Sequence, residues 1–101
     1  MDRIDYFARV VEESPTVARA RFAYAVELQR VGRNREAITQ YRAYLALDED
    51  EGNAWGRLAE ALVAVGDHDQ AADAYLAGID QALKFGHHGM ADDLRTALEG
   101  L

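Results

Sequence analysis

The sequence predicts an all-α protein in which antiparallel helix pairs stack on one another. Half of the 101 residues are hydrophobic and 29% are charged, a composition that favours a folded core over disorder. The sequence matches itself when it is shifted by 34 residues, and most of the matching residues are helix formers. Turn-forming residues separate apolar segments that are each about as long as one helix. Because one helix pair cannot bury both of its faces, the pairs are expected to stack.

The internal repeat aligns eight pairs of residues across this shift. The pairs are Ala20/Ala54, Ala25/Ala59, Leu28/Leu62, Val31/Val65, Gly32/Gly66, Ala37/Ala71, Tyr41/Tyr75 and Ala43/Ala77. The same shift backwards places Phe7 under Tyr41. The period fits a helix–turn–helix unit and is too short for a propeller blade.

Turn and capping residues delimit the first three helices. We expect them over about residues 2–13, 17–31 and 35–47. Ser14-Pro15 ends the first helix, because proline disfavours the helical conformation in the residue before it. Thr16 and Asn34 are the expected N-caps of the second and third helices. Gly32 is expected to end the second helix in the left-handed conformation.

The last three helices are delimited in the same way. We expect them over about residues 53–65, 68–84 and 90–99. The acidic run 48–51 precedes the fourth helix, where the helix dipole favours negative charge. Gly66 and Gly86 close the fourth and fifth helices, and Asp67 caps the fifth.

Alanines and tyrosines indicate how the helices pack. Ala25 should oppose Ala37, and Ala59 should oppose Ala71, so that the paired helices approach to the close end of the range of roughly 8–10 Å. The second helix has one apolar face at helical spacing. Its members are Val17, Ala20, Tyr24, Leu28 and Val31.

The two repeated tyrosines predict contacts between neighbouring helix pairs. Tyr41 and Tyr75 are expected to reach from the second helix of each pair to the next pair.

These residues resemble the signature of the tetratricopeptide repeat (TPR) family over about residues 2–84. The matching residues of the second unit are Trp55, Leu58, Ala59, Leu62, Gly66, Ala71 and Tyr75, and those of the first are Tyr24, Ala25, Leu28, Gly32, Ala37 and Tyr41. Pro15 matches the turn proline of the family. The departures are Arg21 in place of Trp, Tyr44 and Gly78 in place of Ala, and Glu49 in place of Pro.

The resemblance implies a right-handed superhelical stack, an α-solenoid, of about two and a half TPR units. The chain would be a single TPR domain, 1–101, with a half repeat at 2–15, repeats at 18–51 and 52–85, and a capping helix at 86–101 that covers the last apolar face. Trp55 is expected to be largely buried between the helices of its unit. Its replacement by alanine would then cost about 3–5 kcal/mol.

The resemblance also implies a concave groove, lined by the first helix of each pair, that binds a peptide or protein segment. The groove positions are Arg19, Phe22, Val26, Gln29 and Arg30 in the first unit, and Asn53, Gly56, Arg57, Glu60, Val63 and Ala64 in the second. Phe22 and Val26 give the second helix a second apolar stripe. This stripe either packs on the neighbouring first helices or forms an apolar patch that is rimmed by arginines.

The charges narrow the class of partner. The net charge is −7 and the basic residues are scattered, so nucleic acid is not expected as a ligand. Arg19, Arg30 and Arg57 favour a segment that combines an apolar anchor with acidic groups. The Lys and Asn clamp of chaperone-binding TPR proteins is absent, because those positions hold Phe22, Val26 and Arg57.

A structural role is the alternative. An unpaired first helix would expose Ile4, Phe7 and Val11, and a second copy could then dock on it to form a homo-oligomer. Light scattering across a concentration series distinguishes the two hypotheses.

The sequence contains few residues that could form a catalytic or metal site. There is no cysteine, no phosphate-binding glycine loop and no positioned nucleophile, so we expect a non-enzyme without a cofactor or a metal. The one cluster that could hold an ion is His87, His88, Asp92 and Asp93, in which His88 and Asp92 stand four residues apart. The apolar segments are too short to span a membrane and no secretion signal is evident, so we expect a cytoplasmic protein with no membrane partner.

Overall fold

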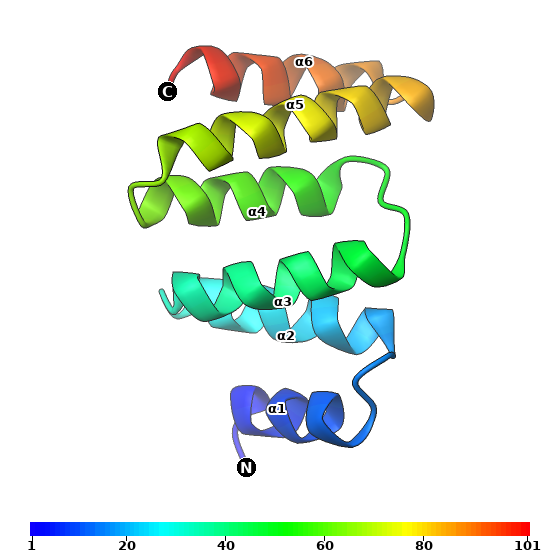
Figure 1. Ribbon diagram of the computed structural model, residues 1–101, viewed down its shortest axis with the longest axis vertical. Coiled ribbons are helices and arrows are strands. Elements are labelled where there is room, and N and C mark those ends of the chain that lie inside the picture. The colour runs from blue at the N-terminus through cyan, green and yellow to red at the C-terminus, as the bar shows by residue number, and fades with distance from the viewer. The chain divides into compact units, whose positions relative to one another are not determined.

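The computed structural model describes all residues from Met1 to Leu101 and contains six α-helices and no strand (Figure 1). The helices are α1 (Arg3–Glu13), α2 (Ala18–Arg30), α3 (Asn34–Leu47), α4 (Asn53–Ala64), α5 (His68–Lys84) and α6 (His88–Glu99). The chain forms two compact units, unit 1 (Met1–Glu49) and unit 2 (Asp50–Leu101). Successive helices run antiparallel within each unit. The all-α prediction is confirmed, and no helix has the length and apolar character that crossing a bilayer requires.

Three helices end in the same glycine turn. Gly32, Gly66 and Gly86 have φ values of 83°, 84° and 77°. After α2, the amides of Gly32 and Arg33 donate to the carbonyls of Gln29 and Leu28. The turns after α4 and α5 repeat both hydrogen bonds at equivalent positions. This is the Schellman arrangement, and it favours glycine because a side chain is strained at positive φ.

The predicted N-caps are correct at one helix and wrong at two. Asp67 caps α5 as expected, because its carboxylate accepts a hydrogen bond from the Gln70 amide at 3.1 Å. Thr16 does not cap α2, because Val17 occupies the N-cap position and the helix begins at Ala18. Asn34 lies inside α3, and its side-chain amide donates to the Gly32 carbonyl.

The acidic run before α4 contributes one buried cap. The Asp50 carboxylate accepts hydrogen bonds from the amides of Gly52 and Ala54, both at 2.8 Å. The α4 amides have no partner within the helix at its first turn, so this carboxylate satisfies them and also meets the positive end of the dipole.

In unit 1, α2 packs on α3 through small side chains and one tyrosine. Ala25, Ala37, Leu28 and Tyr41 are fully buried. The Tyr41 hydroxyl donates to the side-chain carbonyl of Gln29. The Tyr41 hydroxyl therefore bonds to the other helix of its own pair, and the expectation that its side chain reaches the next pair stays a prediction.

The apolar face of α2 is shorter than predicted. Val17 and Val31 are both exposed, although Ala20 and Leu28 are buried. Both valines are cap residues with non-helical backbone angles, so their side chains leave the helical face.

Arg21 explains one departure from the TPR signature. Its Nε donates to the Pro15 carbonyl at 3.0 Å, and its Nη1 donates to the side-chain carbonyl of Gln40 at 2.9 Å. Polar contacts thus hold α2 to α3 and to the preceding turn, at a position where the family has an indole.

The first helix is better covered than the sequence suggests. Val11 is buried, and Ile4 and Phe7 are half-buried. α1 packs on α2 within unit 1. The predicted exposed stripe of Ile4, Phe7 and Val11 is therefore wrong.

In unit 2, α6 packs on α5 and inserts Leu94 beside two glycines. A β-carbon on Gly56 would lie 2.8 Å from Leu94 Cδ2, and one on Gly78 would lie 3.0 Å from Leu94 Cδ1 and from Trp55 Cβ. Such separations are too short for carbon atoms. Gly78, a departure from the TPR signature, is thus the residue that lets helices α4, α5 and α6 meet.

The remaining contacts of α6 bury the end of α5. Ile79, Ala82 and Ala91 form a buried cluster. Met90, Leu94 and Leu98 pack against it from α6. Trp55 is mostly buried, and its Cβ lies against Gly78 of α5, which agrees with the prediction of a largely buried residue between the helices of its unit. The cost of truncating the Trp55 ring stays a prediction.

We predict that Gly78→Ala destabilises the protein by about 1–3 kcal/mol, although alanine is normally the better helix former. The reason is that the new methyl group meets Leu94 and Trp55. Urea unfolding followed by circular dichroism measures the change.

Gly89→Ala is the matched control, because Gly89 also lies in a helix and a β-carbon there meets nothing within 4 Å. This variant should be neutral or more stable by up to about 1 kcal/mol. Equal stability of the two variants would contradict the glycine contact.

Candidate functional site

The eleven residues predicted for the groove fall on the two expected helices. Five lie on α2 in unit 1 and six lie on α4 in unit 2. Those on α2 are Arg19, Phe22, Val26, Gln29 and Arg30, and those on α4 are Asn53, Gly56, Arg57, Glu60, Val63 and Ala64.

Two of the α2 residues make contacts inside unit 1. The Phe22 ring packs on the rings of Tyr41 and Tyr44, with centroids 6.0 and 5.2 Å apart. The Gln29 side chain accepts the hydrogen bond of the buried Tyr41 hydroxyl. Both residues therefore attach α2 to α3, while Val26 is half-buried and Arg19 is exposed.

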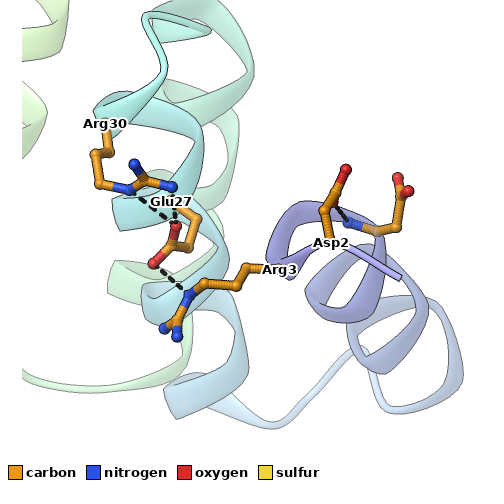
Figure 2. A network of polar contacts seen from close by, with 5 residues as sticks. Asp2, Arg3, Glu27 and Arg30 are labelled. Atoms are coloured by element: carbon orange, nitrogen blue, oxygen red, sulfur yellow. Dashed lines mark hydrogen bonds and ion pairs between the residues drawn. The ribbon is translucent and has the colours of Figure 1, made fainter.

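Arg30 belongs to an ionic network that joins α1 to α2 (Figure 2). The buried Glu27 carboxylate accepts hydrogen bonds from Arg30 Nη2 at 3.0 Å, from Arg30 Nε at 3.1 Å and from Arg3 Nε at 2.9 Å. The hydrogen bond from Arg30 is the largest cause of a lowered pKa at Glu27, and Arg3 adds to it against the opposing effect of burial. Glu27 thus stays ionised between two guanidinium groups.

Four of the six α4 residues line one pocket in unit 2. Its volume is about 240 Å³, and its lining consists of Gly52, Asn53, Gly56, Arg57, Glu60, Met90 and Leu94. Asn53, Arg57 and Glu60 come from one side of α4 at helical spacing. Met90 and Leu94 come from α6, so the pocket has a polar wall and an apolar wall.

Glycines shape the floor of this pocket. A β-carbon on Gly52 would lie 2.9 Å from the Met90 sulfur, and one on Gly56 would meet Leu94. Gly52 has a φ of 122°, which a residue with a side chain rarely adopts. The two α6 side chains can therefore rest against bare backbone of α4 and its N-terminus.

The polar wall carries charges of both signs. Arg57 is half-buried and Glu60 is exposed. Burial, followed by the charge of Glu60, raises the pKa of the Tyr75 hydroxyl on α5, so this group stays neutral. The wall offers a guanidinium donor, a carboxylate acceptor and the Asn53 amide to a ligand that enters over Met90 and Leu94.

The sequence prediction does not include Met90 or Leu94 among the site residues. The spacing of Met90, Leu94 and Leu98 marks an apolar face on the last helix, and the sequence predicts only a capping role for that helix. Their place in the pocket depends on how α6 crosses the glycines of α4 and α5, and no local pattern encodes that contact.

The residues considered for an ion do not come together as a metal site. His87 Nε2 pairs with Glu51 Oε1 at 2.7 Å, and Asp92 Oδ1 accepts a hydrogen bond from Arg95 at 3.0 Å. No group of three or more histidine or acidic side chains has the arrangement to hold a metal ion. The His87 and Asp92 side chains thus pair with other residues on the surface.

Comparison with known protein families finds no family model that matches the sequence. The resemblance to the TPR family therefore rests on the repeated residues alone.

We predict that Glu27 makes the stability of the protein depend on pH. Its pKa is lower in the folded protein than its ordinary value of 4.5, so its stabilising effect is complete above that value and is lost as the pH falls through the folded pKa. The difference in unfolding free energy between the parent and Glu27→Gln should shrink in acid. Urea unfolding at a series of pH values measures it.

The double variant Arg3→Gln/Arg30→Gln is the control, because it keeps Glu27 but removes both of its ion pairs. The double variant should lose the same pH-dependent part of the unfolding free energy as Glu27→Gln. A difference between parent and Glu27→Gln that does not change with pH would contradict the network.

Proposed function

We propose that this protein is a short helical-repeat module of the TPR type that binds an extended segment of another protein. The repeat supports this proposal, since the turns at Gly32 and Gly66 have the same hydrogen bonds and nearly the same φ. The alanine pairs Ala25/Ala37 and Ala59/Ala71 support it too, because all four residues are fully buried. Both features are those of stacked helix pairs.

The pocket of unit 2 is the observation that carries the binding function. It brings four predicted groove residues together with two apolar side chains that the capping helix supplies. Its volume is below that of a typical drug-sized site, so it would accept one or two side chains of a segment rather than a whole metabolite.

The chemistry of the two walls indicates how a segment would bind. An aliphatic or aromatic side chain would rest on Met90 and Leu94 and lose contact with water. The Arg57 guanidinium would donate to a carbonyl or carboxylate oxygen of the segment, and the Asn53 amide would pair with its backbone. Recognition by a few such contacts on a rigid scaffold suits a transient adaptor.

Self-assembly through the terminal helices has less support. Its basis was an exposed apolar stripe on the first helix, and Val11 in that stripe is buried. We therefore do not adopt it as the proposed function.

We predict that peptides selected on the immobilised full chain from a random displayed library combine an apolar residue with polar or acidic neighbours. Arg57→Ala should weaken binding of a selected peptide by about 1–3 kcal/mol, because a charge-assisted hydrogen bond in a half-buried wall is lost. Isothermal titration calorimetry measures the affinity.

Arg95→Ala is the matched control, since Arg95 is an exposed arginine of the same unit that pairs with Asp92 outside the pocket. Its effect should stay within about 0.5 kcal/mol. Equal effects of the two variants, or no enrichment of any peptide, would overturn the pocket as the binding site.

A further inference from the structure

We propose that unit 1 contains a second recognition pocket, which binds a segment that carries a carboxylate next to an aliphatic side chain. The pocket has a volume of about 390 Å³ and is lined by Met1, Asp2, Arg3, Ile4, Arg30 and Val31. It lies where the first turn of α1 meets the last turn of α2, so it is distinct from the pocket of unit 2. The proposal goes beyond the function proposed above and does not depend on it.

The two arginines keep donors for a ligand. Arg3 uses only Nε for Glu27, so both of its Nη groups remain, and Arg30 keeps Nη1. The Arg3 side chain is 70% exposed. A guanidinium group has five N–H donors in a planar fork, and such forks match the two oxygens of a carboxylate.

Glu27 holds both forks in place before a ligand arrives. It is buried on α2 and bonds one arginine through each of its carboxylate oxygens (Figure 2). Arg3 is further positioned over the Phe7 ring, with its guanidinium carbon 5.8 Å from the ring centroid. Because long side chains lose rotamer entropy on binding, this arrangement lowers the cost of ordering them.

The apolar part of the lining selects the neighbour of the carboxylate. Val31 is 48% exposed, and Ile4 is half-buried beside it in the lining. An aliphatic side chain that covers them would remove apolar surface from water. The ligand therefore needs an aliphatic group and a carboxylate within one or two residues of each other.

The donors that remain on the arginines favour a carboxylate. Arg3 and Arg30 each pair with the Glu27 carboxylate, which offsets part of their positive charge. The N–H groups that these pairs leave available have the directed, planar geometry that matches the two oxygens of a carboxylate.

The distribution of charge along the chain also favours binding of an acidic ligand segment to unit 1 rather than to unit 2. Unit 1 contains eight basic and eight acidic side chains, while unit 2 contains three basic and ten acidic ones. The whole net charge of −7 thus resides in unit 2. Unit 1 has no net charge, so an acidic segment can approach it without net electrostatic repulsion, whereas the negative charge of unit 2 repels such a segment.

The test uses two synthetic probes, the peptide amides acetyl-Ala-Leu-Asp-Leu-Ala and acetyl-Ala-Leu-Asn-Leu-Ala, with the full chain. The Asp peptide should shift the Nε–Hε NMR signals of Arg3 and Arg30 in a saturable way. It should bind about fivefold to tenfold more tightly than the Asn peptide, since only the carboxylate makes charge-assisted hydrogen bonds.

Arg3→Gln should reduce the affinity for the Asp peptide by about fivefold to tenfold, and Arg9→Gln should change it less than about twofold. Arg9 is the matched control because it is an exposed arginine of α1 outside the pocket lining. In Arg3→Gln the two hydrogen bonds from Arg30 still hold Glu27, and thermal unfolding verifies that the variant is folded.

Several outcomes would overturn the proposal. They are equal binding of the two peptides, equal effects of the Arg3 and Arg9 variants, and tighter binding of inorganic phosphate than of the Asp peptide. Arg57→Ala separates the two pockets. If Arg57→Ala abolishes binding of the Asp peptide, the peptide binds in unit 2 and the proposed unit 1 pocket is wrong. If Arg57→Ala has no effect and Arg3→Gln weakens binding, the peptide binds in the unit 1 pocket independently of unit 2.

Discussion

The close approach of antiparallel helices is the constraint on which both units depend. Four alanines at the helix contacts are fully buried, and Gly78 leaves room for Leu94 and Trp55. Wherever the backbones come this close, even one extra methyl group must displace a neighbour. The glycine turns serve the same constraint, because each of these three-residue connections between helices has a left-handed backbone position at the end of the first helix.

Close packing forces the polar side chains near the helix contacts to satisfy one another. The hydroxyl of fully buried Tyr41 finds its acceptor in Gln29. Arg21 reaches a carbonyl of the preceding turn and the side chain of Gln40. Without these partners, each polar group would lose its hydrogen bonds to water on folding and gain none in return, which would destabilise the folded state. Residues that a repeat pattern assigns to a ligand surface, such as Gln29, can thus be committed to the interior of their own unit.

Both proposed binding pockets lie at the ends of helices, where side chains from two elements converge. In unit 2 the start of α4 meets α6, and in unit 1 the start of α1 meets the end of α2. Helix ends combine backbone groups without an intrahelical partner with side chains that point away from the packed face. The two units differ in charge, because unit 2 carries the entire net negative charge and unit 1 is balanced. This division gives each pocket a different electrostatic setting although the helices are alike.

The sequence by itself determined the six helices, the three glycine turns and the Asp67 cap, because each depends on residues within one or two turns of one another. It also located Asn53, Arg57 and Glu60 on one helix face. Only the tertiary structure decided that the Tyr41 hydroxyl bonds to α2, that Val11 is buried and that Leu94 reaches the glycines of α4 and α5. The link from Arg3 to Glu27 spans 24 residues, and no periodic pattern specifies it. Local patterns encode which residues form a helix and which face is apolar, whereas the partner of each side chain depends on the angle and depth at which two helices pack.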